Sequence, residues 1–212
     1  MPQRRHRDAI RAICDQFDDD YWLEKDKTHS FPFEFAKAIA DGGWLGIAMP
    51  EEHGGAGLGV TEAAIMMQTI AQSGAGFSGA SAVHMNIFGL HPAVVFGTDE
   101  QKRRFLPDIA AGKTIFCQGF SEPGAGSDLG SLSCKAEIDG DHLVVNGQKT
   151  WTSYAHVADL QELLVRTDPD APKHKGISWV VCDMTTPGIE IREIRTMSHV
   201  TDFCEVFYDD VR

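Results

Sequence analysis

The repeat of apolar residues changes near Lys113, and this change limits the chain to a fold of two parts. Before Lys113, apolar side chains recur at helical spacing, as at Ile10, Ile13 and Phe17, whereas after it they alternate, as over residues 132–138. A period near 3.6 residues marks amphipathic helices, and alternation marks half-buried strands. The sequence therefore predicts an α+β multidomain fold: an all-helical domain over residues 1–114, then an antiparallel β-barrel-like domain over residues 115–212.

Prolines, glycines and caps divide the helical half. Thr98 stands three residues before Gln101, the spacing of a capping box. Residues 50–59 contain four glycines and no apolar periodicity, so they are expected to form a loop. The expected helices cover an N-terminal stretch through Tyr21, then residues 32–42, 61–72, 77–90, 92–97 and 98–112.

The second half carries the signals of short strands. Leu132, Cys134, Ala136 and Ile138 are expected on one face of a strand, and Asp139-Gly140 is expected to turn it back as a hairpin. Asp-Pro, Ala-Pro and Pro-Gly breaks separate the later segments. The expected strands cover residues 116–120, 132–138, 142–148, 160–167, 177–183, 189–194 and 204–208.

Composition narrows the possible partners. With 31 acidic and 19 basic residues, the formal charge of -12 argues against nucleic acid, whose binding needs a concentrated positive field. The five cysteines are scattered and form no Cys-x-x-Cys pair, so we interpret them as buried thiols of a reducing compartment. No apolar run approaches the roughly 20 residues that span a bilayer. We therefore expect a cytoplasmic protein in a bacterium, or a mitochondrial matrix protein in a eukaryote.

A glycine loop follows the first expected strand and is a candidate ligand site. Residues 122–128 read Glu-Pro-Gly-Ala-Gly-Ser-Asp, and glycines let the backbone approach a ligand closely. A dinucleotide-binding turn is disfavoured, because Leu129 occupies the place of its third glycine and a strand, not a helix, is expected next. The lysine of a P-loop and the G-x-S-x-G elbow of serine hydrolases are also missing from the sequence.

Metal and simple acid–base chemistry have little support. The nine histidines include no H-E-x-x-H or comparable cluster, so we expect no metal site. Glu51, Glu52 and His53 precede glycines and are interpreted as a solvated loop.

The stretch Asn-Gly-Gln-Lys-Thr-Trp-Thr-Ser at residues 146–153 is a second candidate. A tryptophan is more often a core residue, but Trp151 leaves a turn and two hydroxyl residues follow it. The flat indole of Trp151, with the hydroxyl groups of Thr152 and Ser153 as hydrogen-bond donors beside it, suits the binding of a planar heteroaromatic ring.

The two stretches together resemble the acyl-CoA dehydrogenase family. The main signature is Gly-Phe-Ser-Glu-Pro-Gly-Ala-Gly-Ser-Asp at residues 119–128, followed by the stretch at residues 146–153. Supporting matches are Pro-Glu-Glu-His-Gly-Gly at 50–55, Gly-Thr-Asp-Glu-Gln-Lys at 97–102 and Glu-Val-Phe-Tyr-Asp-Asp-Val at 205–211. The resemblance covers nearly the whole chain.

This resemblance implies an FAD-dependent enzyme that oxidises an acyl-CoA thioester to the trans-2-enoyl-CoA and passes electrons to an electron-transfer flavoprotein, within a homo- or hetero-oligomer. Ser121 would hydrogen-bond the pyrimidine side of the flavin, Trp151 would pack on the flavin, and Ser153 would lie near its N5 atom. Ser127 would contact the acyl-CoA. The implied cofactor-binding residues are Gln118, Phe120, Ser121, Gly126, Ser127, Trp151, Thr152 and Ser153.

The resemblance also implies that the catalytic base is not in this chain. In the family that glutamate lies in a C-terminal helical domain, so the base and a third segment are expected beyond Arg212, and neither Glu122 nor Glu162 is assigned in its place. Leu160 departs from the tryptophan that many relatives carry there. The segments at 156–159 and 166–169 resemble bacterial members.

Two alternatives remain open. One is a flavin oxidase or monooxygenase of the same fold, in which reduced flavin meets O₂. The other is a non-catalytic subunit that scaffolds a complete partner dehydrogenase.

Overall fold

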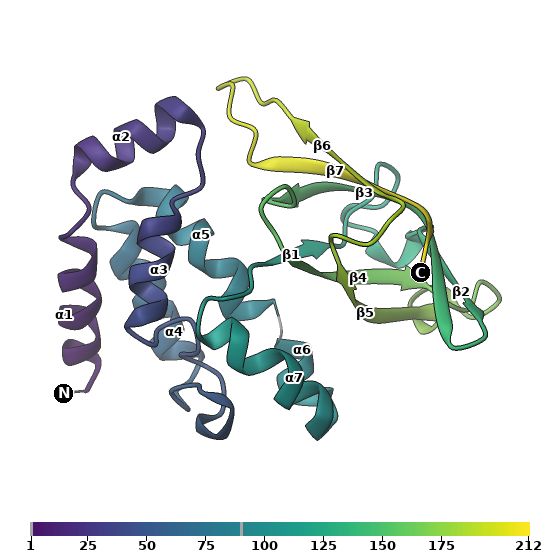
Figure 1. Ribbon diagram of the computed structural model, residues 1–212, viewed down its shortest axis with the longest axis horizontal. Helices are drawn as coiled ribbons and strands as arrows, with labels where there is room; N and C mark the ends of the chain where they lie inside the picture. The colour runs from purple at the N-terminus through teal and green to yellow at the C-terminus, as the bar shows by residue number, and fades with distance from the viewer. Residues whose placement is uncertain (1, 90) are drawn as a thin grey trace. The chain divides into compact units, whose positions relative to one another are not determined.

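Helices make up the described part of the chain before Phe116, as the sequence predicts (Figure 1). The computed structural model describes residues 2–89 and 91–212; Leu90, the expected end of one helix, lies outside them. The helices are α1 (Pro2–Cys14), α2 (Asp19–Thr28), α3 (Phe33–Asp41), α4 (Val60–Ala71), α5 (Gly76–Phe88), α6 (His91–Phe96) and α7 (Asp99–Ala110). The glycine-rich segment after Pro50 holds one short 3-10 turn, Glu51–His53, and is otherwise irregular.

The N-terminal helix ends earlier than the sequence predicts. A single helix through Tyr21 is wrong, because the chain stops being helical after Cys14 and starts again at Asp19. The Asp18 side chain accepts a hydrogen bond from the Tyr21 backbone N–H at 3.0 Å, which caps the new helix. The capping box at Thr98 and Gln101 is confirmed, with both reciprocal hydrogen bonds present.

Apolar faces of α1, α3 and α4 form the core of this helical unit. Ile10, Phe35, Ile39, Met66 and Ile70 are completely buried in it. Removing that apolar area from water is the main force that holds these short helices together. The chain divides into two compact units between Ile115 and Phe116.

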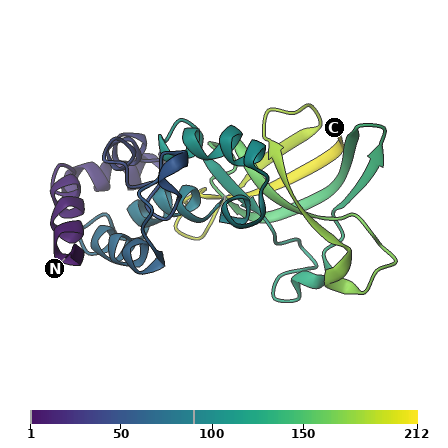
Figure 2. The same cartoon turned by 90° about the horizontal axis from the view of Figure 1, so that it is seen from below.

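A curled sheet of seven strands forms the second unit (Figures 1 and 2). The strands are β1 (Phe116–Gly119), β2 (Lys135–Asp139), β3 (His142–Ser153), β4 (Leu160–Arg166), β5 (Ile177–Asp183), β6 (Ile189–Ile194) and β7 (Phe203–Val211), with 3-10 turns at Leu129–Ser131 and Lys173–Gly176. The order is β1-β4-β2-β3-β7-β6, and β5 pairs with the other side of β4.

The sheet is mixed rather than purely antiparallel. Both β1 and the start of β2 run parallel to β4. The chain passes through β2 and β3 between β1 and β4, and through β3 between β2 and β4, and such connections longer than a hairpin let the later strand enter in the parallel sense. The alternation of the second half is compatible with either direction, because side chains alternate in both.

The strand face expected to carry Leu132, Cys134, Ala136 and Ile138 is not buried along its whole length. Ala136 is buried, but Ile138 is 81% exposed. β4 reaches β2 only at Lys135, so the outer half of the β2–β3 hairpin extends past the sheet and pairs with itself alone.

β3 and β7 pair with two one-residue register shifts that cancel. The first shift places an extra residue on β7, and the second places an extra residue on β3, between Lys149 and Thr152. The partners in order are Val145 with Val211, Gly147 with Tyr208, Lys149 with Val206, and Thr152 with Cys204. Because Val206 and Cys204 both face the core, Lys149 and Thr152 face it too.

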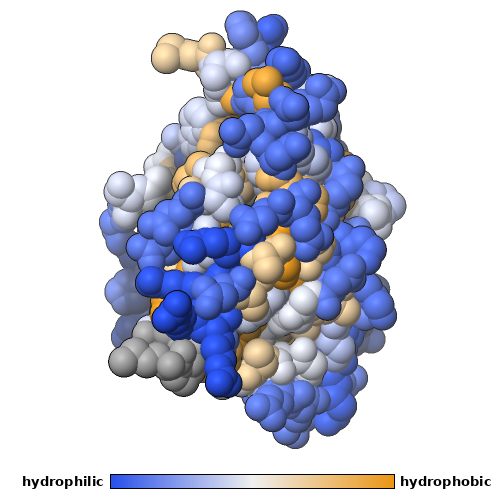
Figure 3. Space-filling model, turned by 90° about the vertical axis from the view of Figure 1, so that its left-hand side faces the viewer, coloured by the Kyte–Doolittle hydropathy of each residue, from blue (hydrophilic) through white to orange (hydrophobic). Residues whose placement is uncertain are grey.

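Cys14, Cys117, Cys134 and Cys204 are buried free thiols, as expected, whereas Cys182 is only half-buried. On the face shown in Figure 3, hydrophilic side chains dominate. Among the residues with a described structure, no helix has both the length and the apolar character needed to cross a membrane.

Candidate functional site

The glycine loop after β1 closes on itself and leaves its outer side open. Glu122 and Ala125 exchange two backbone hydrogen bonds, of 3.0 and 3.1 Å, which form a tight turn around Pro123 and Gly124. A Cβ built on Gly124 or Gly126 would meet no atom within 4 Å. The loop therefore has a fixed base and an exposed backbone that a ligand can approach.

A buried ion pair joins this loop to β3. Lys149 is 0% exposed, and its Nζ lies 2.8 Å from Glu122 Oε1 and 3.1 Å from the Phe120 carbonyl oxygen. One ammonium group thus binds the residues on both sides of Ser121. The extra residue on β3 lies just beyond Lys149 and leaves its inward direction unchanged.

The Glu122 carboxylate is saturated with donors. Besides Lys149, it accepts hydrogen bonds from Ser133 N at 2.7 Å, Ser133 Oγ at 2.8 Å and Cys134 N at 2.8 Å. Burial alone would raise the pKa of Glu122, but the hydrogen bond from Lys149 and the two backbone N–H groups outweigh it and lower the pKa. Glu122 therefore stays ionised and holds structure together, and it is unsuited to act as a base.

The backbone adds a second tie between the two candidate stretches. Thr150 N donates to the Ser121 carbonyl oxygen at 2.9 Å. The Ser121 backbone is thus held beside the segment that carries Trp151, Thr152 and Ser153.

Trp151 faces outward, against the usual tendency of tryptophan to be buried. Its side chain is 59% exposed, and its ring meets only the edge of Phe203, at a centroid distance of 5.9 Å. The backbone φ of Trp151 is +58°, in the left-handed region that a bulky residue rarely adopts. A strained conformation that exposes a large aromatic ring is typical of a binding position.

The neighbouring hydroxyls point in different directions. Thr152 is buried opposite Cys204, and its Oγ1 has no hydrogen-bond partner among the described residues. Ser153 is half-buried opposite Phe203. The Thr152 side chain therefore faces the core, whereas Trp151 is exposed and Ser153 is half-buried.

The remaining predicted residues lie along β1 and the loop. Gln118 is half-buried on β1, in register with Glu162 of β4. Gly126 and Ser127 lie on the exposed outer turn, and no hydrogen bond of the described chain joins them to β3. The structure thus brings Phe120 and Ser121 together with β3, but leaves Gly126 and Ser127 apart from it.

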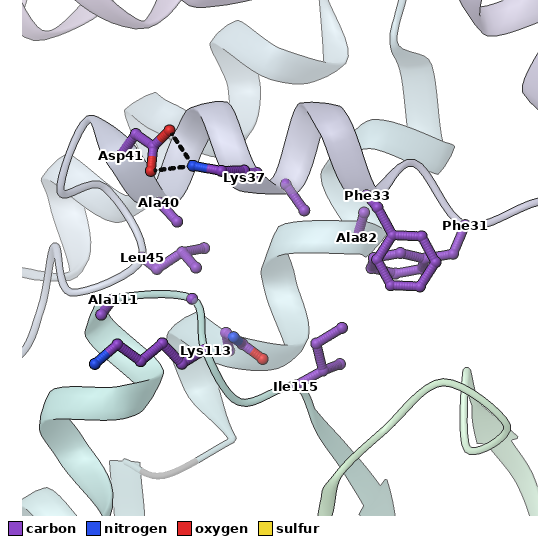
Figure 4. Close-up of a pocket in the computed structure, with 13 residues that line it drawn as sticks. Phe31, Phe33, Lys37, Ala40, Asp41, Leu45, Ala82, Ala111, Lys113 and Ile115 are labelled. Carbon is purple, nitrogen blue, oxygen red and sulfur yellow. Dashed lines mark hydrogen bonds and ion pairs between the residues drawn. The ribbon is translucent and has the colours of Figure 1, made fainter.

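A separate pocket lies within the helical unit (Figure 4). It has a volume of about 370 Å³, and Phe31, Phe33, Leu45 and Ala82 contribute to its apolar wall. Lys37 on its rim pairs with Asp41, with Nζ–O distances of 2.6 and 2.8 Å. None of the predicted site residues lines it.

Metal chemistry has no ligand set in the described ranges 2–89 and 91–212. No three His, Cys, Asp or Glu side chains there are grouped closely enough to hold an ion.

Comparisons with known proteins identify the family. Models of the acyl-CoA dehydrogenase N-terminal domain and middle domain match residues 2–113 and 117–211. Acyl-CoA dehydrogenase IpdE1 of Mycobacterium tuberculosis is 41% identical over 178 residues, which are 82% of this chain and 45% of that protein.

Solved structures are also similar to this chain. A probable acyl-CoA dehydrogenase from Mycobacterium abscessus has a TM-score of 0.92 and 31% identity, over 100% of this chain and 57% of that chain. The ChsE4-ChsE5 complex from Mycobacterium tuberculosis gives a TM-score of 0.85 and 36% identity, over 100% of this chain and 54% of that chain. The chain thus spans about half the length of the relatives it matches, and it belongs to the acyl-CoA dehydrogenase family.

Proposed function

We propose that this chain supplies part of the FAD-binding site of an acyl-CoA dehydrogenase. The enzyme would oxidise an acyl-CoA thioester between C2 and C3 to the trans-2-enoyl-CoA. The observation that carries the proposal is the exposed Trp151 ring beside a loop fixed by Lys149. An aromatic surface of this kind, flanked by hydroxyl and backbone donors, has the form that an isoalloxazine ring requires.

The residues fit the cofactor on structural grounds. Gly124 and Gly126 leave open space where other residues would place a Cβ, so the loop backbone can approach a ring or a phosphate closely. Trp151 offers one ring face, and Ser121 and Ser153 are half-buried hydroxyls on the segments that flank it. We propose Gln118, Phe120, Ser121, Gly126, Ser127, Trp151, Thr152 and Ser153 as the residues that hold FAD, with Ser127 also contacting the acyl-CoA.

Bound FAD supplies the acceptor for the hydride that leaves the β-carbon of the thioester. The residues of this chain would orient the flavin ring and shield it from water. Ser121 and Ser153 would hold the polar edge of the ring, while Trp151 would cover it and exclude water. Lys149 would act indirectly, because its ammonium group binds Phe120 and Glu122 and so fixes the chain on both sides of Ser121.

The base that removes the α-proton is proposed to come from outside this chain. Glu122 is a carboxylate of the glycine loop itself, but its oxygens already accept four hydrogen bonds. We also propose an oligomeric enzyme, because the ChsE4-ChsE5 complex is a relative that assembles from two different chains. An electron-transfer flavoprotein is the proposed electron acceptor.

An FAD titration tests the proposal. We expect the chain alone to bind FAD weakly but saturably, as measured by quenching of FAD fluorescence, and to show no dye-coupled oxidation of an acyl-CoA. Trp151→Ala should weaken binding by about tenfold, the worth of one aromatic stacking contact.

The matched control is Ile138→Ala, which truncates another exposed apolar residue at the tip of the β2–β3 hairpin. The control should bind FAD like the unmodified chain. Equal affinity of the Trp151→Ala variant, or turnover by this chain above the rate of free flavin, would contradict the proposal.

A further inference from the structure

Glu162 is a buried acid on β4 that the proposed reaction does not use. It is 2% exposed and lies between two neighbouring strands, in register with Gln118 of β1 and Val181 of β5. The indole Nε1 of Trp179, also on β5, donates to Glu162 Oε2 at 2.9 Å. The side-chain amide of Gln118 is its second hydrogen-bonding neighbour.

No cation compensates the charge of this carboxyl group. In the described chain, no Lys, Arg or His side chain pairs with Glu162, in contrast to the Glu122–Lys149 pair. On β1, the nearby titratable group is the Cys117 thiol, whose pKa is raised mainly by burial and to a smaller extent by the Glu162 charge. On β5, the titratable groups Cys182 and Asp183 lie opposite other residues of β4.

A buried carboxylate with only neutral donors is poorly stabilised in its charged form. Burial accordingly raises the pKa of Glu162 to about 7, although the hydrogen bonds from Trp179 and Gln118 oppose this rise. Glu162 therefore changes charge in the range where bacterial and mitochondrial enzymes work, and it does so beside a residue of the proposed FAD site.

We propose that Glu162 is a positioning residue whose protonation sets which end of the Gln118 amide is presented to the cofactor. An ionised carboxylate only accepts hydrogen bonds, so it holds the Gln118 NH₂ group and leaves the amide oxygen toward the site. A protonated carboxyl group can donate to that oxygen, which turns the NH₂ group toward the site. The Trp179 N–H donates to Glu162 in both states and keeps the carboxyl group in place.

This inference rests on the proposed function, because it needs Gln118 to line the FAD site. The polar edge of oxidised flavin consists mainly of acceptors, its carbonyl oxygens and ring nitrogens. We therefore expect FAD to bind more tightly when Gln118 presents its NH₂ group, which is the state favoured below neutral pH.

The first measurement follows the carboxyl group without any cofactor. In the 15N-labelled chain, the indole N–H resonance of Trp179, assigned with Trp179→Phe, should shift with pH with a midpoint near 7. Glu162→Gln keeps an acceptor of similar shape and should abolish this titration. Persistence of the titration in Glu162→Gln would overturn the assignment to Glu162, as would its absence from the unmodified chain.

The second measurement links the carboxyl group to FAD. The unmodified chain should bind FAD threefold to tenfold more tightly at pH 6 than at pH 8, the effect of about one hydrogen bond. Glu162→Gln and Gln118→Met should each lose this pH dependence, while Gln118→Met should keep the Trp179 titration. That combination separates positioning through Gln118 from a general loss of structure.

The outcomes distinguish the two proposals. An unchanged pH dependence in Glu162→Gln or Gln118→Met, with FAD still bound, overturns this inference and leaves the proposed function intact. No saturable FAD binding at any pH by the folded chain refutes the proposed function, and this inference falls with it.

Discussion

The Lys149–Glu122 pair is predicted to be the largest single polar contribution to the stability of the sheet unit. Breaking a buried ion pair by removing one partner typically costs about 3–5 kcal/mol, because the other charge is left without a partner. Lys149→Met should lie at the lower end, about 3 kcal/mol, since three donors from Ser133 and Cys134 still solvate the carboxylate. Glu122→Gln should be more costly, because it leaves a 0% exposed ammonium group with neutral acceptors only.

The double variant tests the pairing itself. Because both charges are removed together, its loss of stability should be smaller than the sum of the two single losses by about 2–3 kcal/mol. The assay is urea unfolding followed by 19F NMR of 5-fluorotryptophan. Trp151 and Trp179 report on the sheet unit, and Trp22 and Trp44 report on the helical unit. The unfolding of the two units can therefore be followed separately.

Two results would refute this reasoning. One is additivity of the single variants within about 0.5 kcal/mol, which is the behaviour of independent sites. The other is a loss of less than about 1 kcal/mol for either single variant, which is typical of exposed ion pairs. A parallel change in the Trp22 and Trp44 signals would place the effect outside the sheet unit.

Three further predictions concern other positions. The folded-state pKa of Glu162, about 7, exceeds the ordinary value of 4.5, so the folded chain binds the extra proton between these values and loses stability as pH rises through them. The unmodified chain should lose about 3 kcal/mol more than Glu162→Gln between pH 4.5 and pH 8 in urea unfolding; equal pH profiles would contradict this. Gly147→Ala should cost about 1–3 kcal/mol by calorimetry, because φ is +145° and the new Cβ would lie 2.7 Å from Cys134 Cα, whereas the control Gly140→Ala, with no atom within 4 Å, should cost less. Thr98→Ala should lower the free energy of unfolding of the helical unit by about 1 kcal/mol through loss of the α7 cap, and unchanged amide exchange at the start of α7 would refute it.

Periodicity and turn chemistry predict the fold class well, because both act locally. The β5 and β6 ranges of 177–183 and 189–194 agree with the structure, and so does the capping box at Thr98. The break after Cys14 was missed because the apolar spacing continues through Phe17 and Tyr21, whereas the side chain that starts α2 is the polar Asp18. The parallel pairing of β1 with β4 was missed because alternation along a strand carries no information about the direction of its neighbour.

The candidate site was predicted as two stretches, but not how they are joined. Glu122 and Lys149 are 27 residues apart, and a charged residue in a polar motif is ordinarily taken as exposed. One signal was available: Lys149 follows a strand pattern in which it shares the inward face with Val145. The outward direction of Trp151 could not be derived, since it depends on a register shift that only the pairing with β7 reveals.

The extra residue on β3 makes the direction of Trp151 a property of strand register rather than of side-chain chemistry. In an uninterrupted strand, Trp151 would continue the inward series of Val145 and Lys149. Deleting Thr150 alone would remove the extra residue and pair Trp151 with Glu205, so the indole would stay on the outward face and Thr152 would stay opposite Cys204. If the extra residue lay beyond Trp151 instead, Trp151 would pair with Cys204 and the indole would turn inward, although every residue of the motif is retained.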